Sequence, residues 1–305
     1  MIAFCYPGQG SQEVGMGQAM ATAVPAARAV FDAADEALGF SLSAICAEGP
    51  IERLTETEIT QPALVTTSLA CVAALREAGI TADVHVGHSV GEYAALAGAG
   101  LADDVDAIRL VRARGEATAA AARRRPGAMA AILGLDDAVV VGLCAGIDGV
   151  WPANYNSPGQ IVVSGTLDGV DSLIAAAEAA GARRAIKLKV AGGFHSPLSA
   201  SAGDDLRPVL ETVAFRHPSS RFFSTTTVRD EDEQTIAQLL IDQLGAPVRF
   251  TQSVHALRDE GVETFVEVGS GSVLSGLIRR IDRSLATLSV QAPDDIPRLR
   301  ELLDA

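Results

Sequence analysis

Cysteine, aromatic residues and positive charge are all scarce in this 305-residue chain. The four cysteines, at positions 5, 46, 71 and 144, lie far apart and form no C-x-x-C pair, so we expect no disulfide framework and no metal site. Only 24 Lys and Arg residues stand against 38 Asp and Glu, which gives a net charge of −14. Nonspecific binding to nucleic acid or to an anionic membrane needs clustered positive charge, so we expect neither as a partner.

Long apolar runs are missing as well. We find no uninterrupted apolar segment of the roughly 20 residues that a bilayer-spanning helix needs. The first residues, Met1 to Tyr6, lack the basic region and the long apolar stretch of a signal peptide and lead directly into Pro7-Gly8. We therefore expect a cytoplasmic protein.

Small aliphatic residues are abundant instead. The composition is 48% hydrophobic but 4% aromatic, which matches helices packed closely on a largely parallel sheet. A chain of this length fits one large α/β domain, or a main domain that carries a smaller one. Apolar patterns predict strands at 2–6, 84–86, 222–224 and 264–268, and helices at 17–38, 63–75 (introduced by Thr60-Gln61-Pro62), 93–99, 105–124, 235–244 and 273–281.

The pattern changes between residues 128 and 190. The expected order is strand 128–133, helix 136–144, strands 150–156 and 161–164, helix 170–180 and strand 185–190. This βαββαβ order is typical of a ferredoxin-like unit. We therefore predict an α/β-hydrolase-like catalytic domain formed by residues 1–126 and 192–305, with a ferredoxin-like subdomain, residues 127–191, inserted into it.

A candidate nucleophile follows the second predicted strand of the main domain. Gly87-x-Ser89-x-Gly91 lies between a strand and a helix, as in a nucleophile elbow, where the glycines allow a strained turn that exposes the serine hydroxyl. The N–H of Val90, at the start of the helix, is placed to donate to the oxyanion that forms when Ser89 attacks a carbonyl group.

A serine nucleophile needs a base, and the chain has five histidines. His85 lies inside a predicted strand, His88 lies in the elbow, and His217 and His255 lie in polar or helical surroundings. His195 lies on an irregular loop where the small domain ends. We therefore predict that His195 is the general base.

Several ordered motifs along the whole chain carry a resemblance to a known family. They are Pro7-Gly8-Gln9-Gly10-Ser11-Gln12, Thr60-Gln61-Pro62-Ala63, Gly87-His88-Ser89-Val90-Gly91-Glu92, Arg112-Ala113-Arg114-Gly115, Asn156-Ser157-Pro158-Gly159-Gln160, Gly193-Phe194-His195 and Glu267-Val268-Gly269. With these motifs the chain resembles the malonyl-CoA:acyl carrier protein transacylases of fatty acid synthesis and the related acyltransferase domains of polyketide synthases.

The resemblance implies a ping-pong transfer of malonyl from coenzyme A to the phosphopantetheine thiol of an acyl carrier protein. Ser89 would be the acylated nucleophile and His195 the base, with the N–H groups of Gln9 and Val90 as the oxyanion hole. Arg114 would bind the malonyl carboxylate, since a guanidinium grips a carboxylate with two parallel hydrogen bonds. Coenzyme A is then a substrate, and no cofactor is implied.

The resemblance also implies further contacts with the acyl group. Gln61 and His88 would line the substrate pocket, and the ring of Phe194 would crowd an α-methyl branch and so favour malonyl. Gln160 fits a turn residue better than a binding residue. The position of Ala246 in the family supplies a main-chain carbonyl that orients the histidine, which alanine can do as well as the more usual asparagine.

Other functions share some of these features. A polyketide acyltransferase acting in trans, or the malonyltransferase subunit of a malonate decarboxylase, would carry the same motifs. A serine esterase or thioesterase would share the elbow but needs an acidic residue between Ser89 and His195. The candidates Asp168 and Asp171 resemble helix caps. A noncatalytic binding protein would not need Ser89, His195 and the glycine-rich loop together.

Overall fold

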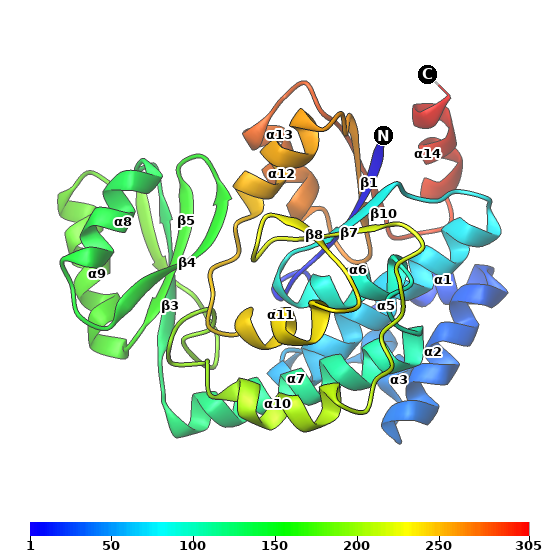
Figure 1. Ribbon diagram of the computed structural model, residues 1–305, viewed down its shortest axis with the longest axis horizontal. Coiled ribbons are helices and arrows are strands. Elements are labelled where there is room, and N and C mark those ends of the chain that lie inside the picture. Colours follow the sequence, from blue (N-terminus) through cyan, green and yellow to red (C-terminus); the bar gives the residue numbers. More distant parts are fainter. Residues whose placement is uncertain (305) are drawn as a thin grey trace.

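The computed structural model describes residues 1–304, and its main sheet has six strands (Figure 1). The strand order is β10-β9-β1-β2-β7-β8, and all neighbouring pairs are parallel except β7 and β8. The expected α/β class with a largely parallel sheet is confirmed. The strands are β1 (Ile2–Tyr6), β2 (Val84–Gly87), β7 (Arg221–Ser224), β8 (Arg229–Glu231), β9 (Thr264–Val268) and β10 (Ala286–Val290).

Helices cover both faces of this sheet because its strands are apolar on both sides. Phe4 and Tyr6 of β1 face a large core, whereas the alternating Ala3 and Cys5 face a second core with α12 and α13. The helices are α1 (Gln18–Ala23), α2 (Pro25–Leu38), α3 (Leu42–Glu48), α4 (Ile51–Leu54), α5 (Thr57–Glu77), α6 (Glu92–Gly98), α7 (Asp104–Arg124), α10 (Ala202–Leu210), α11 (Ile236–Asp242), α12 (Phe250–Asp259), α13 (Val273–Ile281) and α14 (Asp295–Leu303).

A second, antiparallel sheet is formed by the predicted βαββαβ segment. Its strand order is β4-β5-β3-β6, and α8 and α9 pack on the face turned away from the main sheet (Figure 1). Its elements are β3 (Ala128–Leu133), α8 (Asp137–Ala145), β4 (Val150–Ser157), β5 (Gln160–Gly165), α9 (Leu167–Ala179) and β6 (Arg184–Lys187). The other face carries Met129 and Val162 and meets Phe194. The domain boundaries remain a prediction.

Helix α5 runs through the largest core and differs from the expectation at its start. It begins at Thr57, so Pro62 lies in its second turn. Because proline has no N–H, the carbonyl of Glu58 lacks its usual partner within the helix. That carbonyl accepts a hydrogen bond from Arg112 Nη1 at 2.6 Å instead. By length and composition α5 passes the criteria for a membrane span, but polar residues interrupt its sequence and 89% of the window that passes is buried inside the protein.

Candidate active site

The turn after β2 has the geometry of a nucleophile elbow. Ser89 has a φ of 54°, in the left-handed region, and opens a short 3₁₀ turn that continues into α6. A Cβ atom on Gly87 would lie 2.1 Å from the main chain of Gly91 and Glu92, and one on Gly91 would lie 2.2 Å from the carbonyl oxygen of Tyr6. Only glycine fits at both positions, and the strained turn holds the Ser89 side chain at the edge of the sheet.

The Ser89 hydroxyl contacts His195, which the sequence places more than a hundred residues away. Ser89 Oγ lies 2.6 Å from His195 Nε2. His195 Nδ1 lies 3.1 Å from the carbonyl oxygens of both Gln243 and Ala246, so Nδ1 carries the proton and Nε2 accepts from the serine. The Ala246 contact agrees with the sequence prediction, and the Gln243 contact was not predicted.

His195 is held in its neutral form by its surroundings. Its side chain is buried on the loop between β6 and α10, and its φ of 56° is again left-handed. Burial, together with the nearby Arg114 and His88, lowers the pKa of His195 to about 3, although the two carbonyl contacts oppose this shift. The imidazole is therefore neutral near pH 7, which leaves the lone pair of Nε2 free to accept the hydrogen bond from Ser89.

These residues line a cavity of about 360 Å³ between the two sheets. Its apolar wall comes partly from the small sheet, through Met129 and Val162, and partly from α13. Val90 does not line the cavity with its side chain, which is buried below the elbow. The other seven residues predicted for the site do line it, namely Gln9, Gln61, His88, Ser89, Arg114, Phe194 and His195.

The glycine-rich loop after β1 lies directly beside the elbow. A Cβ atom on Gly8 would be 2.8 Å from the carbonyl oxygen of His88, so only glycine allows this approach. The next residue, Gln9, reaches the cavity. The loop therefore brings the main chain of Gln9 close to the turn that carries Ser89 and Val90.

Arg114 reaches the cavity from α7 and is buried. Its Nη1 donates to Gln61 Oε1 at 2.8 Å, and its Nη2 donates to Gln243 Oε1 at 3.1 Å and to Ser89 Oγ at 3.2 Å. Among residues 1–304, no carboxylate forms an ion pair with it, and its Nε has no hydrogen-bond partner. Burial lowers the pKa of Arg114, and the nearby Tyr93 and Glu92 oppose that shift. The site thus contains a buried cation held only by neutral groups.

His88 and Gln160 complete the wall on the side of the small sheet. His88 Nε2 lies 2.8 Å from Asn156 Oδ1, and its ring meets the ring of Phe250 edge to face. Gln160 lines the cavity and accepts a hydrogen bond from Arg280 Nη1 at 2.6 Å. Asn156 lines the cavity too but was not assigned a role from the sequence.

The two aspartates that could have served as the acid of an esterase do not line the cavity. Asp168 and Asp171 are on α9, where Thr166, rather than either aspartate, caps the helix by accepting from the Gly169 N–H. Asp171 pairs with Lys187 at 2.6 Å. The imidazole of His195 is oriented by two main-chain carbonyls, which differs from the Ser-His-acid arrangement.

Comparisons with known proteins agree with this geometry. The sequence profile of the acyl transferase domain family matches residues 3–297. The chain is 45% identical to the malonyl CoA-acyl carrier protein transacylase of Bacillus subtilis, with 97% of this chain and 95% of that protein covered. It is 41% identical to the protein of the same name from Escherichia coli K12, with 99% of both covered.

Solved structures of malonyltransferases are also similar to this chain. The acyl-carrier-protein-S-malonyltransferase of Bartonella henselae superposes with a TM-score of 0.96 at 37% identity, with 100% of this chain and 99% of that one covered. A malonyl-transacylase solved in complex with its type II PKS acyl-carrier protein superposes with a TM-score of 0.95 at 38% identity, covering 99% of both chains. The likeness therefore extends over both sheets and the cavity between them.

Proposed function

The chain belongs to the acyl transferase domain family and, within it, to the malonyl-CoA:acyl carrier protein transacylases, and we propose that its transfer of malonyl proceeds through a covalent ester on Ser89. One observation carries this proposal. The Ser89 hydroxyl lies between the base His195, at 2.6 Å, and the unpaired cation Arg114, at 3.2 Å. A nucleophile, its base and a site for a free carboxylate thus meet in one cavity.

The first half-reaction loads the enzyme. His195 Nε2 takes the hydroxyl proton while Ser89 Oγ forms a bond to the thioester carbon of malonyl-CoA, and the N–H groups of Gln9 and Val90 stabilise the oxyanion. The carbon–sulfur bond then breaks, and His195 gives the proton to the leaving sulfur, so that coenzyme A departs as its thiol. The carbonyls of Gln243 and Ala246 support the imidazolium that exists between these two transfers.

The second half-reaction repeats these steps in the opposite direction. His195 takes the proton of the phosphopantetheine thiol of the carrier protein, and the sulfur attacks the malonyl ester. Ser89 leaves as an alkoxide and regains the proton from His195. Because both steps pass through a tetrahedral intermediate at the same carbon, one oxyanion hole serves both.

The free carboxylate of malonyl would lie on Arg114. A buried guanidinium without a carboxylate partner is costly, and malonyl supplies that partner whereas acetyl does not. Phe194 and Gln61 line the same space and would limit the size of the acyl group.

Intact-mass spectrometry tests the covalent step. Wild type and Ser89→Ala are incubated briefly with malonyl-CoA and then with a phosphopantetheinylated carrier protein. We expect a malonyl adduct on the wild type alone, followed by its transfer to the carrier. An adduct on Ser89→Ala would contradict the assignment of the nucleophile. Rapid release of free malonate without a carrier product would indicate a thioesterase instead.

A further inference from the structure

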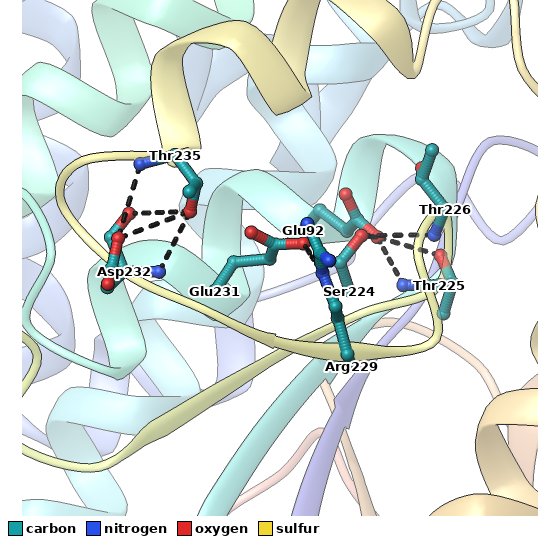
Figure 2. A network of polar contacts seen from close by, with 8 residues as sticks. All are labelled: Glu92, Ser224, Thr225, Thr226, Arg229, Glu231, Asp232 and Thr235. Atoms are coloured by element: carbon teal, nitrogen blue, oxygen red, sulfur yellow. Dashed lines mark hydrogen bonds and ion pairs between the residues drawn. The ribbon is translucent and has the colours of Figure 1, made fainter.

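Glu92 is a fully buried acidic residue next to the nucleophile, and the mechanism above does not use it. It is the first residue of α6, three positions after Ser89, and its exposed fraction is 0%. Oε1 accepts hydrogen bonds from the Thr225 N–H at 2.6 Å, from Thr225 Oγ1 at 2.8 Å and from Ser224 Oγ at 3.1 Å (Figure 2). Oε2 accepts from Gln243 Nε2 at 2.5 Å.

These donors indicate the protonation state of the Glu92 carboxylate. The main-chain N–H of Thr225 and the side-chain NH₂ of Gln243 can only donate, and each faces a different oxygen of Glu92. Burial raises the pKa of Glu92, and the hydrogen bonds from Thr225, Gln243 and Ser224 oppose that shift. Both oxygens therefore act as acceptors, as they do in an ionised carboxylate.

Gln243 connects Glu92 to both functional groups of the site. It is fully buried, and its Nε2 also lies 3.2 Å from the carbonyl oxygen of Ser89. Its Oε1 faces a donor of Arg114, whereas its Nε2 faces two acceptors, so only one orientation of the amide satisfies all three neighbours. The main-chain carbonyl of the same residue accepts from His195 Nδ1.

We propose that Glu92 is a positioning residue that fixes Gln243 and, through it, the direction of Arg114 and His195. The proposal rests on the function proposed above and adds to it the element that sets acyl selectivity. Glu92 does not line the cavity, and it has no hydrogen bond to the Ser89 hydroxyl or to the His195 ring. It acts because its carboxylate selects the orientation in which the Gln243 amide presents its oxygen to the guanidinium.

The intervening amide has a second consequence. A carboxylate placed directly on Arg114 would occupy the guanidinium donors that malonyl needs. With Gln243 between them, Glu92 provides a buried negative charge near Arg114 without forming an ion pair with it. Arg114 therefore stays oriented and charged, and its remaining donors stay available for the carboxylate of the acyl group.

The variant Glu92→Gln tests this relay. Thr225 holds the side-chain oxygen of the introduced glutamine, so the NH₂ group of that glutamine faces the NH₂ of Gln243. If the Gln243 amide rotates to relieve that conflict, its NH₂ faces Arg114, so two donors oppose each other in either orientation. We expect kcat/KM for malonyl-CoA to fall about 10-fold to 100-fold, the range that one hydrogen bond to a charged group represents. The ratio of malonyl to acetyl transfer should fall with it.

Glu267→Gln is the matched control. Glu267 is also fully buried, and its two oxygens accept from the N–H groups of Leu274 and Ser275, so the substitution creates the same conflict between donors. Glu267 lies on β9 and has no contact with Gln243 or Arg114. We expect Glu267→Gln to lose thermal stability but to keep the wild-type ratio of malonyl to acetyl transfer. If Glu92→Gln also kept that ratio, the proposal would be overturned.

The double variant Glu92→Gln/Gln243→Glu keeps the test decisive if Glu92→Gln does not fold. The reciprocal exchange lets the introduced amide donate to the introduced carboxylate, but it places that carboxylate directly on Arg114 and removes the donor to the Ser89 carbonyl. We expect part of the stability and of acetyl transfer to return while malonyl transfer does not. Equal recovery of both acyl groups would contradict the relay. Absence of a malonyl adduct on wild type would reject the proposed function itself, and the two failures are therefore distinguishable.

Discussion

At the scale of single residues, Arg114 is the group that we propose selects the acyl group. Its guanidinium is buried among Gln61, Gln243 and Ser89, with no ion-pair partner in the described chain. We expect Arg114→Ala to reduce the preference for malonyl over acetyl about 100-fold or more, because a buried ion pair loses about 3–5 kcal/mol when one partner is removed. Competition between malonyl-CoA and acetyl-CoA, followed by mass spectrometry, measures this ratio.

Arg109→Ala is the control for that experiment. Arg109 lies on the same helix, but it is exposed. The Arg109→Ala variant should therefore keep the wild-type preference for malonyl over acetyl. An Arg114→Ala variant with unchanged malonyl preference would show that the carboxylate binds elsewhere.

Residues with a local sequence signature were predictable, and residues defined only by contacts were not. Ser89 lies between two glycines that the elbow requires, and His195 was the one histidine on a suitable loop. Gln243 carries no such signature, because it follows an ordinary helix and becomes important only where α11 meets the elbow. Glu92 is the last residue of the elbow motif that begins at Gly87. The role that we propose for it depends on contact with Gln243, which only the fold reveals.

At the scale of elements, the elbow depends on glycine for steric reasons that can be tested. A Cβ atom at Gly87 would meet the main chain of Gly91 and Glu92 at 2.1 Å, and main chain cannot rotate away as a side chain can. We expect Gly87→Ala to lower the free energy of unfolding by about 2–4 kcal/mol and to abolish acylation of Ser89. Urea denaturation and intact-mass spectrometry measure the two effects.

Gly142→Ala provides the opposite case. Gly142 lies within α8, and nothing lies within 4 Å of the Cβ position. Alanine should therefore raise the free energy of unfolding by about 0.5–1 kcal/mol, because it restricts the unfolded chain and favours helix. If both alanine variants were equally stable, the steric argument for the elbow would be wrong.

The elements found from the sequence were those with strong apolar patterns. Strands β1, β2 and β9 and the βαββαβ order agree with the prediction, because each is bounded by glycine, proline or a clear change of pattern. The unpredicted α3, α4, α10, α12 and α14 are mostly short or amphipathic, and β8 and β10 lie at the edges of the sheet, where burial is weaker. Strand β6 ends at Lys187 rather than Val190, since Val190 N–H bonds back to Leu188 in a local turn.

At the scale of the whole molecule, burial of neutral histidines makes stability depend on pH. Burial is the main cause that lowers the pKa of both His85 and His195 to about 3. In the unfolded chain each would titrate near a pKa of about 6.5. The stability that these groups contribute is therefore complete above about pH 6.5 and is lost as the pH falls from there towards about 3. Burial raises the pKa of Glu92 and of Glu267. The stability that these two carboxyl groups contribute therefore falls as the pH rises, which is opposite to the effect of the histidines.

His85 allows the effect of one group to be isolated away from the active site. Its Nδ1 lies 2.6 Å from the Tyr6 hydroxyl, and a glutamine amide, which has both an acceptor and a donor, can replace this hydrogen bond without titrating. Between pH 7 and pH 5, wild type should lose about 2 kcal/mol more unfolding free energy than His85→Gln, from about 1.36 kcal/mol for each pH unit below 6.5. Urea denaturation at the two pH values gives this difference directly. Equal losses in the two proteins would mean that His85 is already protonated in the fold, or that it is not buried as its contacts with Phe4 and Tyr6 require.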